Sequence, residues 1–231
     1  MGLSLHWEFS SGPMDAAAAS AWVRQLRDYA AGLNFAEVSE VVEAELSRRD
    51  PSAGEAEMAE RAWAMCQGMR LQASPTPEDP TRTVRVPPVH VVAFRAYVAG
   101  AEEAAFGLAC HGPGGYTWSG GCATQGASKR GGAAAFLSAH RTVVAVLDKA
   151  RALPGGVRVA VRDDGGFWET RDPKVLLDKL AEWQSLTSAI SRGGKDRTRP
   201  VTLASDVRDL IEARRRERPR LDRPPVEELE G

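Results

Sequence analysis

Residues Trp118–Gly132 read Trp-Ser-Gly-Gly-Cys-Ala-Thr-Gln-Gly-Ala-Ser-Lys-Arg-Gly-Gly. The stretch places glycines, small hydroxyl side chains, an amide, a thiol and two cations between a predicted strand at 116–124 and a predicted long helix at 131–153. Glycine permits sharp bends and close approach of another backbone, and the start of a helix can hold an anion. The stretch therefore predicts where strand, turn and helix meet, and it marks a candidate site.

The apolar residues on either side predict a mixture of strands and amphipathic helices. Alternating or densely β-branched segments predict further strands at 3–9, 36–46, 89–98 and 157–161. Segment 36–46 also fits a helix, but its valines favour a strand. Helical spacing of apolar residues predicts helices at 14–33, 55–71 and from Asp172 onward. Ser11 is the expected cap of the first helix, and Gly32 is its expected end.

Three segments read as turns or irregular structure. Residues 72–88 are rich in proline and predict an internal loop, and residues 99–115 are rich in glycine and predict irregular structure. The sequence Asp163-Asp-Gly-Gly166 is typical of a tight turn, so residues 167–170 are expected to return as a partner strand to 157–161.

These elements predict the α+β class, with a mostly antiparallel sheet and helices packed on one face. Two β-α-β halves on either side of the proline-rich loop are a further expected arrangement. We expect a single domain over residues 1–196. Residues 197–231 are expected to form a basic, flexible and partly disordered tail with a short helix at 203–218.

Composition excludes several function classes. The chain has 231 residues, of which 43% are hydrophobic and 26% charged, and its net charge is −1. A chain so nearly neutral has no bulk attraction to nucleic acid or anionic lipid, and no apolar run is long enough for a membrane span. The cysteines Cys66, Cys110 and Cys122 are too few and too scattered for a disulfide framework. We therefore expect a cytoplasmic protein with reduced thiols.

Three motifs together resemble an uncharacterised family of bacterial single-domain α+β proteins. They are Cys122-Ala-Thr-Gln-Gly-Ala-Ser128, Phe136-Leu-x-x-x-His140 and Arg162-Asp-Asp-Gly-Gly-Phe-Trp-Glu-Thr-Arg-Asp172. The family patterns are Cys-Lys-Thr-Gln-Tyr-Ala-Ser, Phe-Leu-x-x-x-His and Asp-Glu-Gly-Gly-Tyr-Trp-Glu, so this chain departs from them at Ala123 and Gly126. The resemblance covers about residues 3–196. It implies a fold and supplies no activity.

The same motifs contain the residue types that a thiol-dependent enzyme requires. Cys122 is a candidate nucleophile, His140 a candidate base and Glu169 a candidate orienting acid. The alternative is that Cys122 and His140 are buried packing residues, because His140 lies on the apolar side of its helix. The neighbouring carboxylates Asp163 and Asp164 belong first to the turn.

The glycine-rich segment also contains residues suited to a ligand. Gln125 and Ser128 can donate and accept hydrogen bonds, and Lys129 and Arg130 could hold a phosphate or carboxylate. A metal site is not expected, because the spacing of Cys110, His111, Cys122 and His140 matches no compact zinc pattern. No cofactor is expected either.

The arginines of the tail could contact phosphates, but no aromatic residues lie between them and no nucleic-acid-binding motif accompanies them. The sequence thus favours a non-catalytic protein that binds a small anion or a protein partner through residues 115–132. The alternative is a small thiol-dependent hydrolase or transferase. Both hypotheses require the three motifs to converge in space and to shape a single recess.

Overall fold

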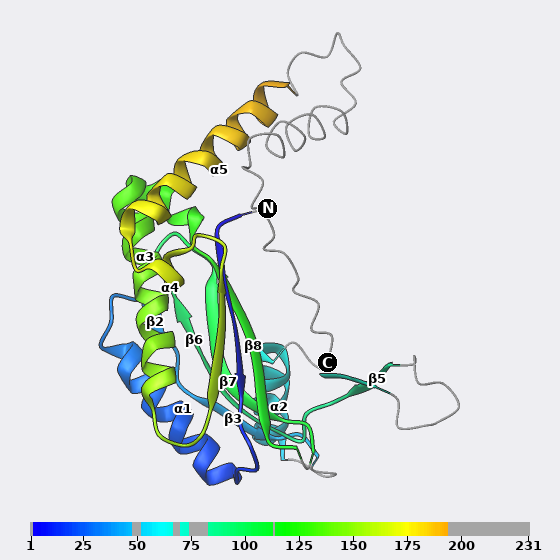
Figure 1. The fold of residues 1–231 in the computed structure, drawn as a ribbon. Coiled ribbons are helices and arrows are strands. Elements are labelled where there is room, and N and C mark those ends of the chain that lie inside the picture. The colour runs from blue at the N-terminus through cyan, green and yellow to red at the C-terminus, as the bar shows by residue number, and fades with distance from the viewer. Residues whose placement is uncertain (1, 48–51, 67–69, 74–82, 113, 194–231) are drawn as a thin grey trace, which may run out of the picture. The chain divides into compact units, whose positions relative to one another are not determined.

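The computed structural model describes residues 2–47, 52–66, 70–73, 83–112 and 114–193. Its core is a seven-stranded sheet in which every neighbouring pair is antiparallel (Figure 1). The order is β2-β6-β7-β8-β1-β9, with β3 also paired to β6. The strands are β1 Ser4–Ser10, β2 Glu37–Val38, β3 Val42–Glu45, β6 His90–Tyr97, β7 Glu103–Cys110, β8 Tyr116–Ala123 and β9 Arg158–Asp163. β4 Arg70–Ala73 and β5 Thr83–Val86 form a separate two-stranded sheet.

The helices are α1 Ala16–Ala31, α2 Ala53–Met65, α3 Ser128–Ala152, α4 Phe167–Thr170 and α5 Pro173–Gly193, and the 3-10 turn η1 Gln125–Ala127 leads into α3. The α+β class and the antiparallel sheet are confirmed. No helix in the described part of the chain is long and apolar enough to cross a membrane.

One face of the sheet packs against α1 and α3. On β1 the side chains of Leu5, Trp7 and Phe9 are buried, whereas those of His6 and Glu8 are exposed. This alternation follows from the two-residue period of a strand that buries one face only. The ring of Phe9 meets Trp22 of α1 edge-on, with centroids 5.5 Å apart. α1 and α3 also contact each other, and they cover the same face.

Helix α2 lies on the opposite face, which departs from the expected packing of all helices on one face. It contacts β3 and β6, and Ala62 and Met65 are its buried residues. Ala44 of β3 pairs with Val91 of β6, and both side chains are buried although they point away from α1. Strand β6 is therefore covered on both faces, which explains its dense run of valines.

Two elements differ in type from the sequence predictions. Residues 99–115 were expected to be irregular, but β7 runs through them between β6 and β8. Within β7, Gly107 lies against Val92 and Ala93 of β6, where a side chain would collide. The expected strand at 167–170 is the short helix α4, so the tight turn leads into a helix and forms no hairpin.

The boundaries of two helices also differ. Asp15 caps α1, because its Oδ1 accepts a hydrogen bond from the backbone N–H of Ala18 at 2.7 Å. The expected cap, Ser11, instead accepts a hydrogen bond from the N–H of Tyr116 at 3.0 Å. Helix α3 begins at Ser128, earlier than expected, and non-helical dihedrals at Gly131 and Gly132 interrupt it. The expected end of α1 at Gly32 is found.

Contacts divide the chain into one unit of Met1–Trp183 and a second that begins at Gln184. The expected tail at 197–231, with its helix at 203–218, lies outside the described residues. Within the expected loop at 72–88, residues 74–82 also lie outside them, and β4 and β5 lie on either side.

Candidate functional site

A buried hydrogen-bonded chain joins the three sequence motifs. Nδ1 of His140 lies 2.9 Å from Oγ1 of Thr124, and its Nε2 lies 3.0 Å from Oδ2 of Asp163. Thr124 follows β8, His140 is on α3 and Asp163 ends β9. The side chains of His140 and Asp163 are both 0% exposed. The three motifs therefore meet around a histidine that the sequence singled out, but neither of the two described hollows is lined by Thr124, His140 or Asp163.

Asp163 also fixes the turn that follows it. Its Oδ1 accepts a hydrogen bond from the N–H of Gly165 at 2.7 Å, and its Oδ2 accepts one from the N–H of Trp168 at 2.8 Å. Burial by itself raises the pKa of Asp163, but the hydrogen bond and charge of His140 and the two backbone N–H groups outweigh it. The pKa lies below its ordinary value. Nε2 of His140 donates to the ionised carboxylate. Nδ1 accepts from the Thr124 hydroxyl in the neutral ring and donates to its oxygen in the charged ring, so every member has a partner in either form.

Aromatic and aliphatic side chains close this chain off from solvent. The ring centroids of Phe136 and Phe167 each lie 5.9 Å from that of His140. Leu176 of α5 is fully buried and lies so close to Gly165 that a Cβ there would collide with it. The order hydroxyl, imidazole, carboxylate is that of a serine-type triad, but a catalytic triad needs a hydroxyl that substrate can reach. Thr124 is 0% exposed.

The thiol of Cys122 takes no part in this chain. Its Sγ donates a hydrogen bond to the backbone oxygen of Glu102 at 3.2 Å, and the residue is 1% exposed. Burial, and then the charge of Glu102, raise the pKa of Cys122 to about 12. In the sheet Leu5 pairs with both Cys122 and Asp163. At about 4.8 Å per strand, Cys122 and Asp163 are therefore about 10 Å apart.

Glu169 is exposed on α4, and the carboxylate that His140 contacts is that of Asp163. Among the described residues no hydrogen bond joins Cys122, His140 and Glu169. The sequence had indicated that Asp163 belongs first to the turn, and Glu169 was the carboxylate predicted to orient His140. The position of Asp163 after a strand and before Asp-Gly-Gly was the available signal, because such a residue can turn its carboxylate back onto the following N–H groups.

The four candidate ligand residues lie at the start of α3. Ser128 donates from Oγ to the backbone oxygen of Gln125 at 2.8 Å. Oε1 of Gln125 is buried without a hydrogen-bond partner, and its side chain packs against Gly2. Lys129 and Arg130 are exposed. The segment thus serves mainly internal packing, and the two cations are the members that face solvent.

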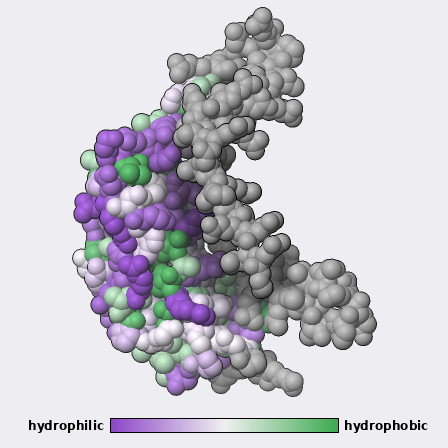
Figure 2. All heavy atoms as spheres, viewed as in Figure 1, coloured by the Kyte–Doolittle hydropathy of each residue, from purple (hydrophilic) through white to green (hydrophobic). Residues whose placement is uncertain are grey.

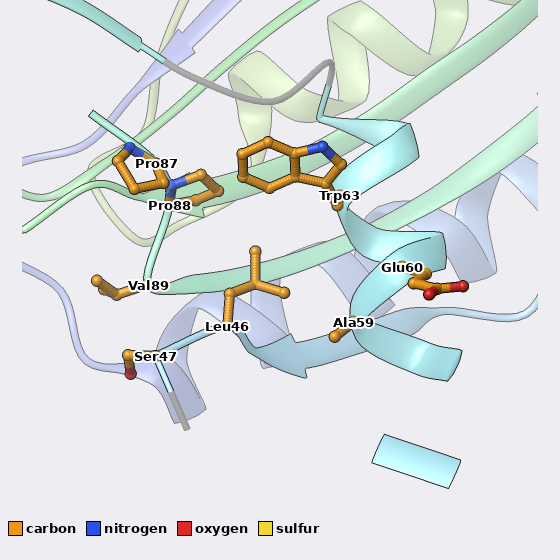
Figure 3. Close-up of a pocket in the computed structure, with 8 residues that line it drawn as sticks. All are labelled: Leu46, Ser47, Ala59, Glu60, Trp63, Pro87, Pro88 and Val89. Atoms are coloured by element: carbon orange, nitrogen blue, oxygen red, sulfur yellow. The ribbon is translucent and has the colours of Figure 1, made fainter. Parts of the chain in front are cut away.

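A groove elsewhere on the surface was not singled out by the sequence analysis. We call it the α2 groove. Its volume is about 450 Å³, and its lining is Leu46, Ser47, Ala59, Glu60, Trp63, Pro87, Pro88 and Val89. Figure 3 shows the indole of Trp63 and the rings of Pro87 and Pro88 bordering the hollow, with Leu46 pointing toward them. Trp63 is 38% exposed and Val89 36%, so apolar surface of both residues is open to solvent in the groove.

The helix predicted at 55–71 rests on a stripe of apolar residues that includes Met65, which is buried, and Met69, which lies outside the described residues. Trp63 lies off that stripe, and an aromatic residue on the polar side of an amphipathic helix was the signal for the groove. Hydrophobic and hydrophilic side chains are interspersed over the face of the molecule shown in Figure 2.

No group of three or more His, Cys, Asp or Glu side chains in the described part of the chain is placed to hold a metal ion. Comparison of the chain with protein-family models, with curated proteins and with solved structures finds no match in any of the three.

Proposed function

We propose that the protein is a non-catalytic binding protein that takes apolar side chains of a partner protein into the α2 groove. The observation that carries the proposal is the exposed indole of Trp63 beside Pro87, Pro88 and Leu46. Tryptophan is among the residues that contribute most to protein–protein binding when it lies in a desolvated pocket. The volume of about 450 Å³ lies within the range of sites that hold a ligand or a few side chains.

The burial of the Cys122 thiol and of the His140 imidazole favours a binding function over a catalytic one. A thiol whose pKa is about 12 is almost entirely protonated at neutral pH, whereas the thiolate is the nucleophile. The His140 chain is enclosed by Phe136, Phe167 and Leu176, so its natural role is to join β8, α3 and β9. The thiol-dependent hydrolase or transferase is therefore the less supported alternative.

Binding of a small anion at Lys129 and Arg130 also stays a proposal, but with less support. Both cations are exposed, and neither lines the α2 groove or the hollow beside His6 and Arg162. A cytoplasmic location agrees with three cysteines that form no disulfide.

Selection of short peptides from a displayed library, with the full chain as the target, tests the proposal. The selected peptides are then measured against the wild type, Trp63→Ala and Tyr29→Ala by isothermal titration. Tyr29 is the matched control, because it is also a large aromatic residue with 38% exposure. We expect peptides rich in apolar residues whose affinity falls at least tenfold in Trp63→Ala and is unchanged in Tyr29→Ala.

Circular dichroism checks that both variants remain folded. Failure to select any peptide, or binders that Trp63→Ala does not weaken, would remove the α2 groove as the binding site.

A further inference from the structure

We propose that the outer edge of β9 accepts an extended, acidic strand from a partner protein. This inference is independent of the α2 groove. Among the described strands β9 (yellow-green in Figure 1) is the last of the sheet and pairs only with β1 (blue). The register runs from Leu5 opposite Asp163 to Ser10 opposite Arg158. In the described part of the chain, the backbone of residues 158–162 makes no hydrogen bond besides those to β1. An edge strand with one unpaired row of N–H and C=O groups can pair with another strand.

The side chains of β9 define what such a strand would carry. Arg158, Ala160 and Arg162 are exposed on the face away from α1 and α3. Val159 and Val161 point to the opposite face and are only half-buried, because no strand lies beyond them. Directly opposed side chains in antiparallel strands lie on the same face about 5 Å apart. The best partner therefore has acidic residues opposite Arg158 and Arg162 and apolar residues opposite the two valines.

A second copy of β9 fits this edge poorly. In an antiparallel pair centred on Ala160, Arg158 of one copy lies opposite Arg162 of the other, and like charges directly opposite each other destabilise a sheet. A shift by one residue would place the valines of one copy beside the arginines of the other. In these two registers the arginines oppose self-pairing, and their charge favours an acidic strand.

The acidic residues that already lie near β9 do not remove its preference for an acidic partner strand. Oδ1 of Asp164 lies 3.6 Å from Nε of Arg162, and its Oδ2 lies 3.7 Å from Nε2 of His6. Glu8 of β1 is opposite Ala160, on the side away from the free edge. The Arg162 side chain remains 75% exposed, so it can meet a second carboxylate.

Two synthetic peptides of seven residues test the edge on the full chain. The acidic peptide is Thr-Glu-Val-Thr-Val-Glu-Thr, and the basic peptide replaces both Glu residues with Lys; both have blocked ends. We expect the acidic peptide to bind at least tenfold more tightly at low salt, and its advantage to shrink as salt rises. Hydrogen exchange should show new protection of amides in β9.

The double variant Arg158→Glu/Arg162→Glu should reverse the preference, and Trp63→Ala should leave it unchanged. Arg141→Glu is the control, because Arg141 is exposed on α3 outside the sheet. A preference that the double variant leaves unchanged, equal affinity for both peptides, or protection that appears only outside β9 would overturn the proposal.

Discussion

Asp163 accepts hydrogen bonds from three places in the chain: the imidazole of His140 and the N–H groups of Gly165 and Trp168. A buried carboxylate is costly unless it is paired and hydrogen-bonded, and here the partners are complete enough to lower its pKa. One residue thus holds the helix α3, the end of β9 and the start of α4 together. At the residue scale, the site therefore stabilises the fold.

We predict that Asp163→Asn lowers the free energy of unfolding at pH 7 by about 3 kcal/mol, because it removes the charged acceptor from a buried pair. Chemical denaturation measures the change. Asp164→Asn is the matched control: its side chain is 34% exposed, and we expect a change within about 0.5 kcal/mol. Equal effects of the two substitutions would contradict the assigned role of Asp163.

The same pair gives a pH dependence whose sign is fixed. The folded-state pKa of Asp163 lies below the ordinary 3.8, so its stabilisation is complete above that value and is lost as the pH falls through the folded-state pKa. The difference between wild type and Asp163→Asn should therefore persist from pH 7 down to about pH 4 and shrink below it. If the difference in free energy of unfolding instead grows as the pH falls, the folded-state pKa of Asp163 is raised rather than lowered.

At the scale of elements, the turn after β9 is shaped by contacts that lie far away in the sequence. Gly166 has φ of 71°, which suits glycine, and α4 begins directly after it. Gly165 has no side chain because Leu176 of α5 and Oδ1 of Asp163 occupy the space beside it. The glycine pair therefore serves a close approach as well as a turn.

We predict that Gly165→Ala destabilises the protein by about 2 kcal/mol, because the new methyl group collides with Leu176 and crowds Asp163. Gly54→Ala is the control. Gly54 lies in α2 with nothing within 4 Å of the added carbon, so its replacement should be neutral or stabilising by up to about 1 kcal/mol. Thermal unfolding of both variants gives the comparison, and a harmless Gly165→Ala would contradict the close packing.

At the scale of the whole sheet, the two faces are covered unequally. α1 and α3 pack on one face and α2 covers part of the other, so β6 is buried on both faces while β1 and β9 expose one. Both proposed binding surfaces lie at margins of this arrangement: the groove beside α2 and the free edge of β9.

We predict that the slowest backbone hydrogen exchange occurs in β6, β7 and β8, and that β9 exchanges faster by at least tenfold. The amides of interior strands exchange only when the whole domain unfolds, whereas an edge strand with one exposed face can unfold locally. Exchange followed by mass spectrometry or NMR measures the order. Protection in β9 equal to that in β6 would contradict it, because the edge would then be covered.

Much of the fold could be predicted from the sequence. The sequence predicted β1, β6 and β8 from the segments Leu3–Phe9, Val89–Val98 and Tyr116–Thr124. Burial of one face of a strand gives alternating apolar residues, and burial of both faces gives a continuous apolar run, so each pattern can be seen in the sequence. Strand β7 could not be predicted in this way. Its alanines and Gly107 have little strand preference of their own, and Gly107 is required by the close approach of β6, which is a tertiary contact.

For the candidate site, the sequence alone singled out three segments, those that contain Cys122, His140 and Glu169, because their glycines, histidine and acidic residues are typical of close packing or of chemistry. Only the tertiary structure decided which of them meet. His140 contacts Thr124 and Asp163, while Cys122 turns toward the Glu102 backbone on the other side. The physical reason is the register of the sheet: it places Leu5 between Cys122 and Asp163, and no local pattern in a sequence specifies which strands lie side by side.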